Sequence, residues 1–303
     1  LEVDLGALLS AEHAADSCPI CAAQAKSSPL FSELVATEGG SMASGTSSDA
    51  LINPNEAPAQ NNANVTGFVA SSASADAQVE AIRAGPIWDL SPGETLSYSF
   101  YDGNVGYDAG TYGSAAVTYN APLGATVINA ANQQHLDKAF AAWDNAMSFD
   151  FEKVVENGTT VGELRSAYTT RAYASATAAA YAYYPDAGVT GGDIWYIDDQ
   201  ATNLDFTPGG YGYFTALHEI GHAVGLSHSF DGSSFGGTNL SAADDIQRNT
   251  VMSYTQTDRN KYFEQVGASL FTRSFYAHTP GVIDVAAAEH IYGVNTSSNL
   301  GDT

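Results

Sequence analysis

The stretch "HEIGHAVGLSH", residues 218–228, holds three of the seven histidines of the chain. On a helix, His218 and His222 are four residues apart, so their imidazoles project from one face and can bind one metal ion. Glu219 lies one residue further round the helix, next to that ion. The stretch therefore predicts a metal site with a general base beside it, which is the arrangement that zinc-dependent hydrolysis requires.

The second half of the stretch predicts a third ligand. Gly225 permits the backbone to leave the helix, because it has no β-carbon to oppose the turn, and His228 can then approach the ion from the loop. Three protein ligands leave a fourth position for water. The alternative is a core helix whose histidines are satisfied by packing. Chance produces a bare His-Glu-x-x-His in roughly one per cent of such chains and the longer pattern far more rarely, which favours the metal site.

The bulk composition restricts the partners of the chain. Its 303 residues suffice for one large domain or two ordinary ones, and no run of about 18 apolar residues predicts a membrane span. The net charge of −24 argues against nucleic acid and anionic membranes as partners. The first residues lack the basic start and apolar stretch of a signal peptide. Cys18 and Cys21 are the two cysteines, so residues 22–303 fold without disulfides.

Hydrophobic patterning divides the chain near residue 80. Residues 22–80 are dominated by Ala, Ser, Asn, Thr and Gly, which predicts an extended or poorly packed segment. The remainder predicts an α/β unit, in which Gly225 and Gly293 end the last two helices. We expect strands at 95–100, 149–156, 163–170, 178–186 and 191–198, and helices at 129–147 and 282–293 and within 211–228, where the helix stops at Gly225.

The full pattern H-E-x-x-H-x-x-G-x-x-H resembles that of the metzincin zinc proteases. Members of that group place a methionine turn beneath the zinc, and "VMSY" supplies Met252 in this position. Tyr254, two residues on, matches the tyrosine that serralysins and astacins place near the zinc. "AYAYYP", "IWY" and "IDVAAAEHIYG" are similar to serralysins of peptidase family M10, which are secreted bacterial proteases. The resemblance covers about residues 84–303.

The resemblance implies an α/β (α+β) metzincin zincin fold, with a twisted mixed five-stranded sheet, an active-site helix and a C-terminal helix. It implies that His218, His222 and His228 bind Zn²⁺, with Tyr254 as a further ligand at rest. Glu219 would take a proton from the zinc-bound water and pass it to the leaving amine. Tyr254 would swing away to hydrogen-bond the oxyanion, whose charge develops in the transition state. The implied function is that of a secreted zinc endopeptidase.

Other residues receive supporting roles. The stretch "AAAYAYYP" would be the edge strand that borders the cleft, where Ala180, Tyr181 and Ala182 bind an extended substrate through the backbone. The alternative is an edge strand that only closes the sheet. Met252 is expected to form a hydrophobic floor under the ligands. For Tyr254, the alternative is an ordinary packed tyrosine.

The resemblance also suggests three regions. Residues 1–80 form an N-terminal extension and a candidate pro-segment that inhibits the site, residues 81–295 form the catalytic domain, and residues 296–303 begin a truncated calcium-binding RTX region. Calcium is therefore a second expected cofactor. Its candidate ligands in that region are Asn299, Gly301 and Thr303.

Two departures from known patterns leave alternatives open. Cys18 or Cys21 could supply a thiolate to the zinc, as in the cysteine switch of matrix metalloproteases, but "SCPIC" lacks that switch motif. A C-x-x-C redox motif is disfavoured because no βαβ pattern surrounds it. Ser229 stands where serralysins usually have proline, so the assignment to a subfamily is less firm than the zinc site.

We expect a monomer that acts on proteins or peptides outside a bacterial cell, exported without an N-terminal signal peptide. One alternative is an inactive zymogen with residues 1–80 in the cleft. The other is a non-catalytic surface-layer or binding protein that keeps the protease fold. Loss of the general base would indicate such a protein, and Glu219 is present.

Overall fold

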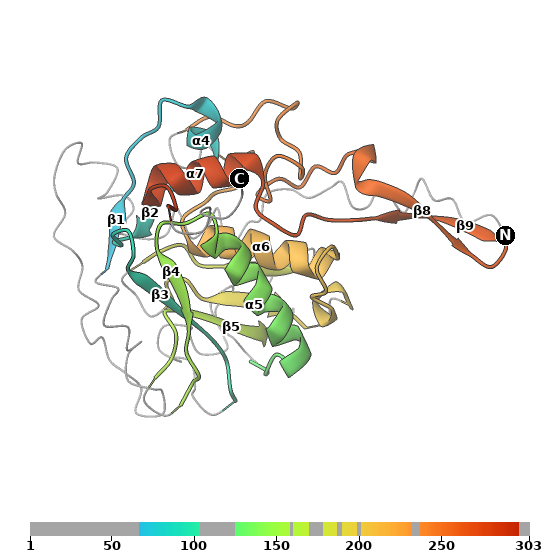
Figure 1. The fold of residues 1–303 in the computed structure, drawn as a ribbon, viewed down its shortest axis with the longest axis horizontal. Coiled ribbons are helices and arrows are strands. Elements are labelled where there is room, and N and C mark those ends of the chain that lie inside the picture. The colour runs from blue at the N-terminus through green and yellow to red at the C-terminus, as the bar shows by residue number, and fades with distance from the viewer. Residues whose placement is uncertain are drawn as a thin grey trace, which may run out of the picture.

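The computed structural model describes residues 67–103, 125–157, 160–169, 178–186, 190–198, 201–231 and 237–296. Within them, a central sheet is covered by helices, and a second, smaller unit of structure projects as a hairpin (Figure 1). The elements are β1 (Phe68–Ala70), α4 (Ala77–Ile82), β2 (Pro86–Trp88), β3 (Thr95–Phe100), α5 (Ala130–Asp144), β4 (Asp150–Lys153), β5 (Leu164–Thr169), β6 (Ala180–Ala182), β7 (Ile194–Ile197), η2 (Ala201–Leu204), α6 (Tyr211–Ala223), η4 (Asp258–Asn260), β8 (Lys261–Val266), β9 (Ser269–Ser274) and α7 (Val282–Tyr292).

The central sheet has five strands in the order β4-β3-β5-β7-β6. Strands β4, β3, β5 and β7 run parallel, whereas β6 runs antiparallel to β7 and lies at an edge of the sheet. β5 and β7 are buried along their whole length, as parallel strands covered on both faces are. The expected α/β fold with a mixed five-stranded sheet, an active-site helix and a C-terminal helix is confirmed.

Helices α5 and α6 pack against each other and against the sheet, and they share one hydrophobic core. α5 begins at Asn129, whose side chain accepts a hydrogen bond from the backbone of Asn132 and caps the helix. Leu136, Phe140 and Trp143 are buried at the helical spacing that the sequence predicts. The indole of Trp143 donates a 2.9 Å hydrogen bond to the Leu217 carbonyl, so the motif helix α6 is tied to its neighbour. A fixed helix is what holds two metal ligands in position.

The expectation of an extended or poorly packed segment is wrong for β1 and α4, which lie within or begin within residues 67–80. β1 pairs with β2, and α4 packs against α7, with Val79 and Ile82 buried. Asp76 caps α4 by accepting a hydrogen bond from Gln78. Composition concealed these elements because a helix of six residues needs few apolar side chains to anchor it. The expected domain boundary between residues 80 and 81 lies inside α4.

The segment after α4 braces the turn that follows the motif helix. α6 ends at Ala223, and Gly225 adopts a φ of +99°, as the sequence predicts for a glycine at this helix end. Arg83 and Leu226 form an antiparallel bridge, in which the Ala84 amide donates to the Gly225 carbonyl at 2.9 Å. The turn that leads to His228 is therefore held from behind by a distant part of the chain.

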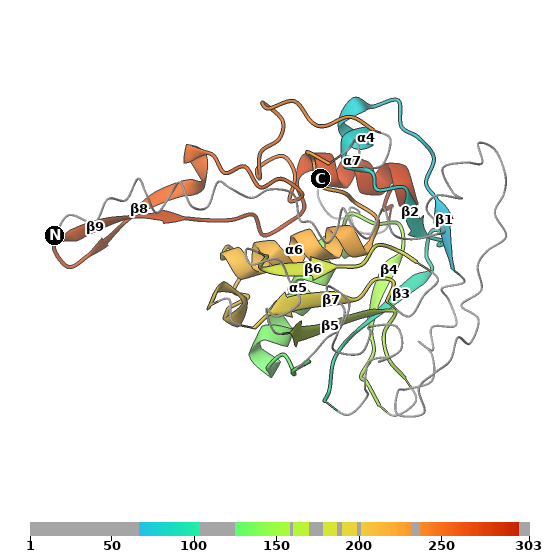
Figure 2. The ribbon, with the colours of Figure 1, turned by 180° about the vertical axis from the view of Figure 1, so that it is seen from behind.

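Strands β8 and β9 form a hairpin that projects away from the body of the molecule (Figure 1, Figure 2). Gly267 has a φ of +62° in its turn, a conformation that glycine adopts without strain. This hairpin was not predicted from the sequence. Nearly all of its residues are exposed, so no buried face imposes the alternation by which strands are detected.

Candidate metal centre

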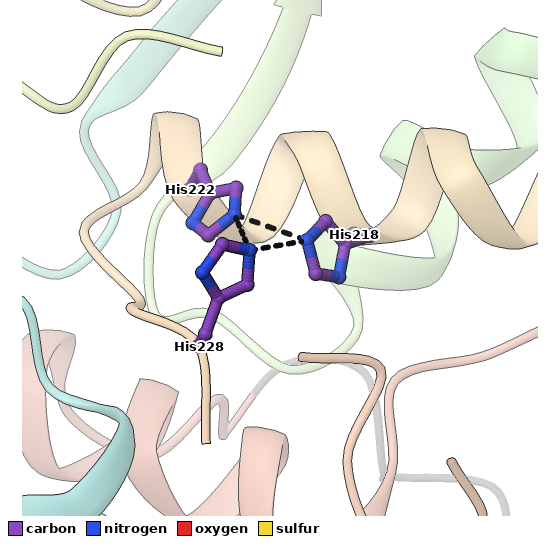
Figure 3. A group of neighbouring side chains, drawn as sticks. All are labelled: His218, His222 and His228. Atoms are coloured by element: carbon purple, nitrogen blue, oxygen red, sulfur yellow. Dashed lines mark hydrogen bonds between the residues drawn. The ribbon is translucent and has the colours of Figure 1, made fainter. Parts of the chain in front are cut away.

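Three imidazole rings converge on one point beside the motif helix (Figure 3). His218 and His222 project from α6, and His228 approaches from the loop beyond the Gly225 turn. The Nε2 atom of His222 lies 3.0 Å from that of His218 and 3.1 Å from that of His228. The remaining pair, His228 and His218, is separated by 3.2 Å. In the part of the chain that the structure describes, this is the one group of His, Cys, Asp or Glu side chains arranged to hold a metal.

The opposite ring nitrogens determine what these Nε2 atoms can do. His218 Nδ1 lies 2.7 Å from the Val251 carbonyl, and His222 Nδ1 lies 2.7 Å from the Leu226 carbonyl. A carbonyl only accepts, so both Nδ1 atoms carry the proton and donate. In the neutral ring the Nε2 atom then presents a lone pair. The dashed contacts in Figure 3 therefore join atoms that have no proton to share, and we read them as neighbouring metal-binding lone pairs.

Burial keeps these rings neutral. All three histidines are at most 5% exposed. Loss of solvation lowers the pKa of His218 to about 4 and lowers the pKa values of His222 and His228 well below the ordinary range of histidine. For His222 and His228, a neighbouring histidine charge contributes further. Neutral imidazole is the form that binds a metal, so protons do not compete for these nitrogens near neutral pH.

The donor set fits zinc. Three lone pairs within 3.2 Å of one another repel unless a cation lies between them. Zinc accepts imidazole nitrogen at about 2.0–2.1 Å, and three protein ligands with one open position are typical of catalytic zinc. The candidate calcium ligands Asn299, Gly301 and Thr303 lie outside the described residues, as do Cys18 and Cys21.

The loop after the third histidine holds that ring in place. Asp231 lies three residues on, with Oδ2 3.0 Å from His228 Nδ1, so this histidine donates to a carboxylate. The ring of Phe230 stacks on His228 at 4.9 Å with an interplanar angle of 5°. Ser229, the departure from the serralysin pattern, donates a 2.6 Å hydrogen bond to Asp245. The roles of Phe230, Asp231 and Asp245 were not predicted from the sequence, although a carboxylate three residues after a candidate ligand was a readable signal.

The predicted methionine turn lies beneath the histidines. Met252 is fully buried, and a β-carbon on Gly221 would come within 2.7 Å of its sulfur, so the methionine packs directly on the motif helix. The neighbouring Val251 is clamped from both sides, because its carbonyl accepts from His218 and its amide donates to Asp284 at 2.7 Å. Asp284 belongs to α7 and was also missed. Nothing local in the sequence connects it to the histidines.

Glu219 and Tyr254 lie beside the three rings. Glu219 follows the first histidine on α6 and is only 5% exposed. Burial is the main cause that raises the pKa of Tyr196 on β7, and the charge of Glu219 raises it further, which places the carboxylate near the sheet. The Tyr254 hydroxyl donates to His228 Nε2 at 2.8 Å, and its side chain is partly exposed. The structure thus brings the Tyr254 hydroxyl to a metal-binding nitrogen, and Glu219 directly follows the first candidate ligand on α6.

Ala180, Tyr181 and Ala182 make up β6, which is the edge strand of the sheet and contacts α6. All three side chains are buried, and they pair with Ile194–Tyr196 of β7. Tyr184, just beyond the strand, meets the His222 ring edge to face at 5.5 Å. The strand therefore runs alongside the metal-binding helix, as the two elements also do in Figure 2.

Comparison with known proteins agrees with this geometry. The family model described as Matrixin matches residues 112–250. "Metalloprotease AprA" of Pseudomonas entomophila (strain L48) is 34% identical over 139 residues, which is 43% of this chain and 28% of the relative. "Serralysin B" of Dickeya chrysanthemi is 27% identical over 215 residues, 69% of this chain and 40% of the relative. "Serralysin" of Proteus mirabilis is 27% identical over 57% of this chain and 37% of the relative. The matched regions span less than half the length of these relatives.

Proposed function

We propose that this chain, which matches the Matrixin family model over residues 112–250 and is similar to serralysins, is a zinc endopeptidase that hydrolyses peptide bonds in proteins. The observation that carries the proposal is the convergence of three neutral, buried imidazoles through atoms that can only accept. A core helix whose histidines are satisfied by packing would not bring three accepting nitrogens within 3.2 Å of one another. We therefore assign His218, His222 and His228 as zinc ligands.

Glu219 is the proposed general base. A bound zinc ion would act as a Lewis acid that polarises the scissile carbonyl and makes water acidic enough to attack it. The Glu219 carboxylate accepts the proton of the attacking water. It then delivers this proton to the amine that leaves when the peptide bond breaks. Because the side chain is nearly buried, little bulk water competes for that proton.

Tyr254 and β6 are proposed to position the substrate and its transition state. The Tyr254 hydroxyl is a donor within 2.8 Å of a ligand nitrogen, where it can hydrogen-bond the oxyanion that forms on the attacked carbonyl. Ala180, Tyr181 and Ala182 would bind an extended peptide along the sheet edge through backbone groups. Backbone recognition accepts many sequences, which suits an enzyme with broad specificity.

We also propose a domain division, a calcium site and a location for this chain. We assign residues 81–295, together with the packed residues 67–80, to the catalytic domain, and residues 1–66 to an extension that inhibits the site until it is removed. Calcium would bind in the region that begins at residue 296, with Asn299, Gly301 and Thr303 as ligands. We further propose a secreted, extracellular bacterial monomer. No helix in the described part has the length and apolarity needed to cross a bilayer.

The proposed activity is tested by Glu219→Ala in the full chain. We expect this variant to keep one equivalent of zinc by elemental analysis and to lose casein cleavage, because the three ligands are untouched and the base is gone. Glu152→Ala, at an exposed position on β4, is the matched control and should retain both properties. Wild-type levels of cleavage by Glu219→Ala, or a wild-type protein that binds no zinc, would refute the mechanism.

Self-inhibition is tested separately by mass spectrometry of the purified chain during incubation. A cut within residues 22–90, accompanied by a rise in casein cleavage, supports the pro-segment. If no cut appears there while casein is cleaved from the start, residues 1–66 do not inhibit the enzyme.

A further inference from the structure

The β8–β9 hairpin presents large apolar side chains to solvent on both faces. Among the described residues, six of the thirteen exposed large hydrophobic side chains lie within residues 262–275. Cross-strand pairing puts Phe263 and Leu270 on one face, with exposures of 72% and 67%, and Val266 and Phe271 on the other. Single exposed hydrophobic residues are normal, whereas a cluster of this kind marks a binding surface.

The hairpin is also incomplete as a sheet. It has two strands in the described part of the chain, and an isolated two-stranded hairpin is at best marginally stable in water. Each strand has an outer edge of backbone N–H and C=O groups, which is a template for one more strand. An added extended segment would pair with these groups and cover apolar side chains at the same time.

Charge distinguishes among the occupants of this surface. The chain carries a net charge of −24, so a second copy of it and an anionic membrane are both repelled. The hairpin itself is locally balanced, because Lys261 pairs with Asp258 and Arg273 pairs with Glu264. An apolar, uncharged polypeptide segment is therefore not repelled by charge at the hairpin. Such a segment also does not have to cover an unpaired charge from either of these two ion pairs.

The root of the hairpin connects it to the proposed active site. The chain enters it shortly after Tyr254 and leaves it through Tyr276, whose amide donates to the Gly209 carbonyl at 3.0 Å. The Tyr276 ring packs on Tyr211 and Phe214 in the first turns of α6. In Figure 2 the hairpin extends beyond that end of the metal-binding helix. A polypeptide bound at the histidines can thus reach the hairpin only if it is long.

We propose that β8 and β9 form an exosite that binds an extended, apolar segment of a protein substrate as a third strand, outside the catalytic cleft. This inference rests on the proposed endopeptidase function. Each six-residue strand is about 20 Å long, so a peptide that pairs along its whole length uses about six residues there and has few left to reach the metal. The exosite would favour long, unfolded chains over peptides without changing the chemistry at the zinc.

The test compares two substrates of the full, zinc-loaded chain: casein and a fluorogenic octapeptide. We expect Phe263→Ser/Leu270→Ser to lower kcat/KM for casein by roughly tenfold, mainly through KM, and to leave the octapeptide unchanged. Val266→Ser/Phe271→Ser tests the other face in the same way. Val155→Ser removes an equally exposed apolar side chain outside the hairpin, and it should affect neither substrate.

Binding gives a second readout that does not depend on turnover. With Glu219→Gln also present to prevent cleavage, labelled casein should bind about tenfold more weakly to one of the two double variants, namely the one that alters the face that casein covers. The exosite is overturned if a variant loses the same fraction of kcat/KM on both substrates, because that result indicates a folding defect. It is also overturned if neither face variant loses activity on casein. A wild-type dimer that these variants dissociate, or hairpin-dependent binding to anionic vesicles, would assign the surface to a different occupant. Failure of the endopeptidase function is distinct, because wild type would then cleave neither substrate.

Discussion

The burial of Glu163 lowers the free energy of unfolding as pH rises, and one substitution should remove this destabilisation. Glu163 immediately precedes β5, is 8% exposed, and desolvation raises its pKa from 4.5 to about 8. Between these values the folded chain holds a proton that the unfolded chain has lost, so the free energy of unfolding falls as pH rises through this interval. Since each pKa unit is worth about 1.4 kcal/mol, the full loss is about 5 kcal/mol above pH 8 and about 3 kcal/mol at pH 7.

Glu163→Gln has the same shape and no charge, so its advantage over the parent should grow with pH. We expect little difference at pH 4.5 and a gain of several kcal/mol at pH 9. The assay is urea unfolding followed by tryptophan fluorescence at both pH values, with Glu219→Gln in every protein to prevent self-cleavage. Glu152→Gln, on the exposed β4 strand, should show no comparable trend. A gain that is constant across this range, or a less stable variant at pH 9, would refute the desolvation argument.

Three further predictions concern the support of the metal centre. Gly225→Ala should lower the free energy of unfolding by about 3 kcal/mol in urea titrations, because its φ is +99° and its β-carbon would lie 2.5 Å from a backbone oxygen. Gly221→Ala should cost about 1–3 kcal/mol in the same assay, since Met252 must move away, and an unchanged midpoint would contradict this packing. Asp231→Ala should weaken zinc binding about 10- to 100-fold in chelator competition, because His228 loses its acceptor.

Gly225→Ala combines a backbone cost from the positive φ with a steric cost from the nearby backbone oxygen, and a glycine with open surroundings separates the two. Gly93 has a φ of +84°, and a β-carbon there would meet nothing within 4 Å. Gly93→Ala therefore reports the backbone cost alone, and Gly225→Ala should exceed it. If the two variants were equally destabilised, the close approach behind the metal-binding turn would contribute nothing. For Asp231→Ala, an unchanged zinc affinity would show that His228 keeps its orientation without the carboxylate.

Elements with a strong local period could be predicted from the sequence, and elements defined by distant partners could not. α5 is identified by Leu136, Phe140 and Trp143, which recur at helical spacing and are all buried. The candidate ligands could be predicted because they lie within eleven residues, so helix geometry alone brings two of them together. β1 and α4 escaped notice because their partners, β2 and α7, lie elsewhere in the chain.

The contacts behind the metal centre show the same limit. Asp284 supports the methionine turn through Val251, and neither residue carries a local pattern that indicates this role. Tyr184 was noted only as part of a strand, yet its ring meets His222. Such contacts depend on tertiary packing, which a single sequence does not display.

The clamp on Val251 has a consequence for the order in which the protein becomes active during its synthesis. The Val251 carbonyl, which orients His218, lies 33 residues further along the chain. Asp284, whose carboxylate accepts a hydrogen bond from the Val251 amide, lies another 33 residues on. A ribosome releases the histidine helix well before it releases α7. We therefore expect the growing chain to carry its ligands long before their rings are fixed. The proposed metal centre would therefore have its full support only after α7 has packed.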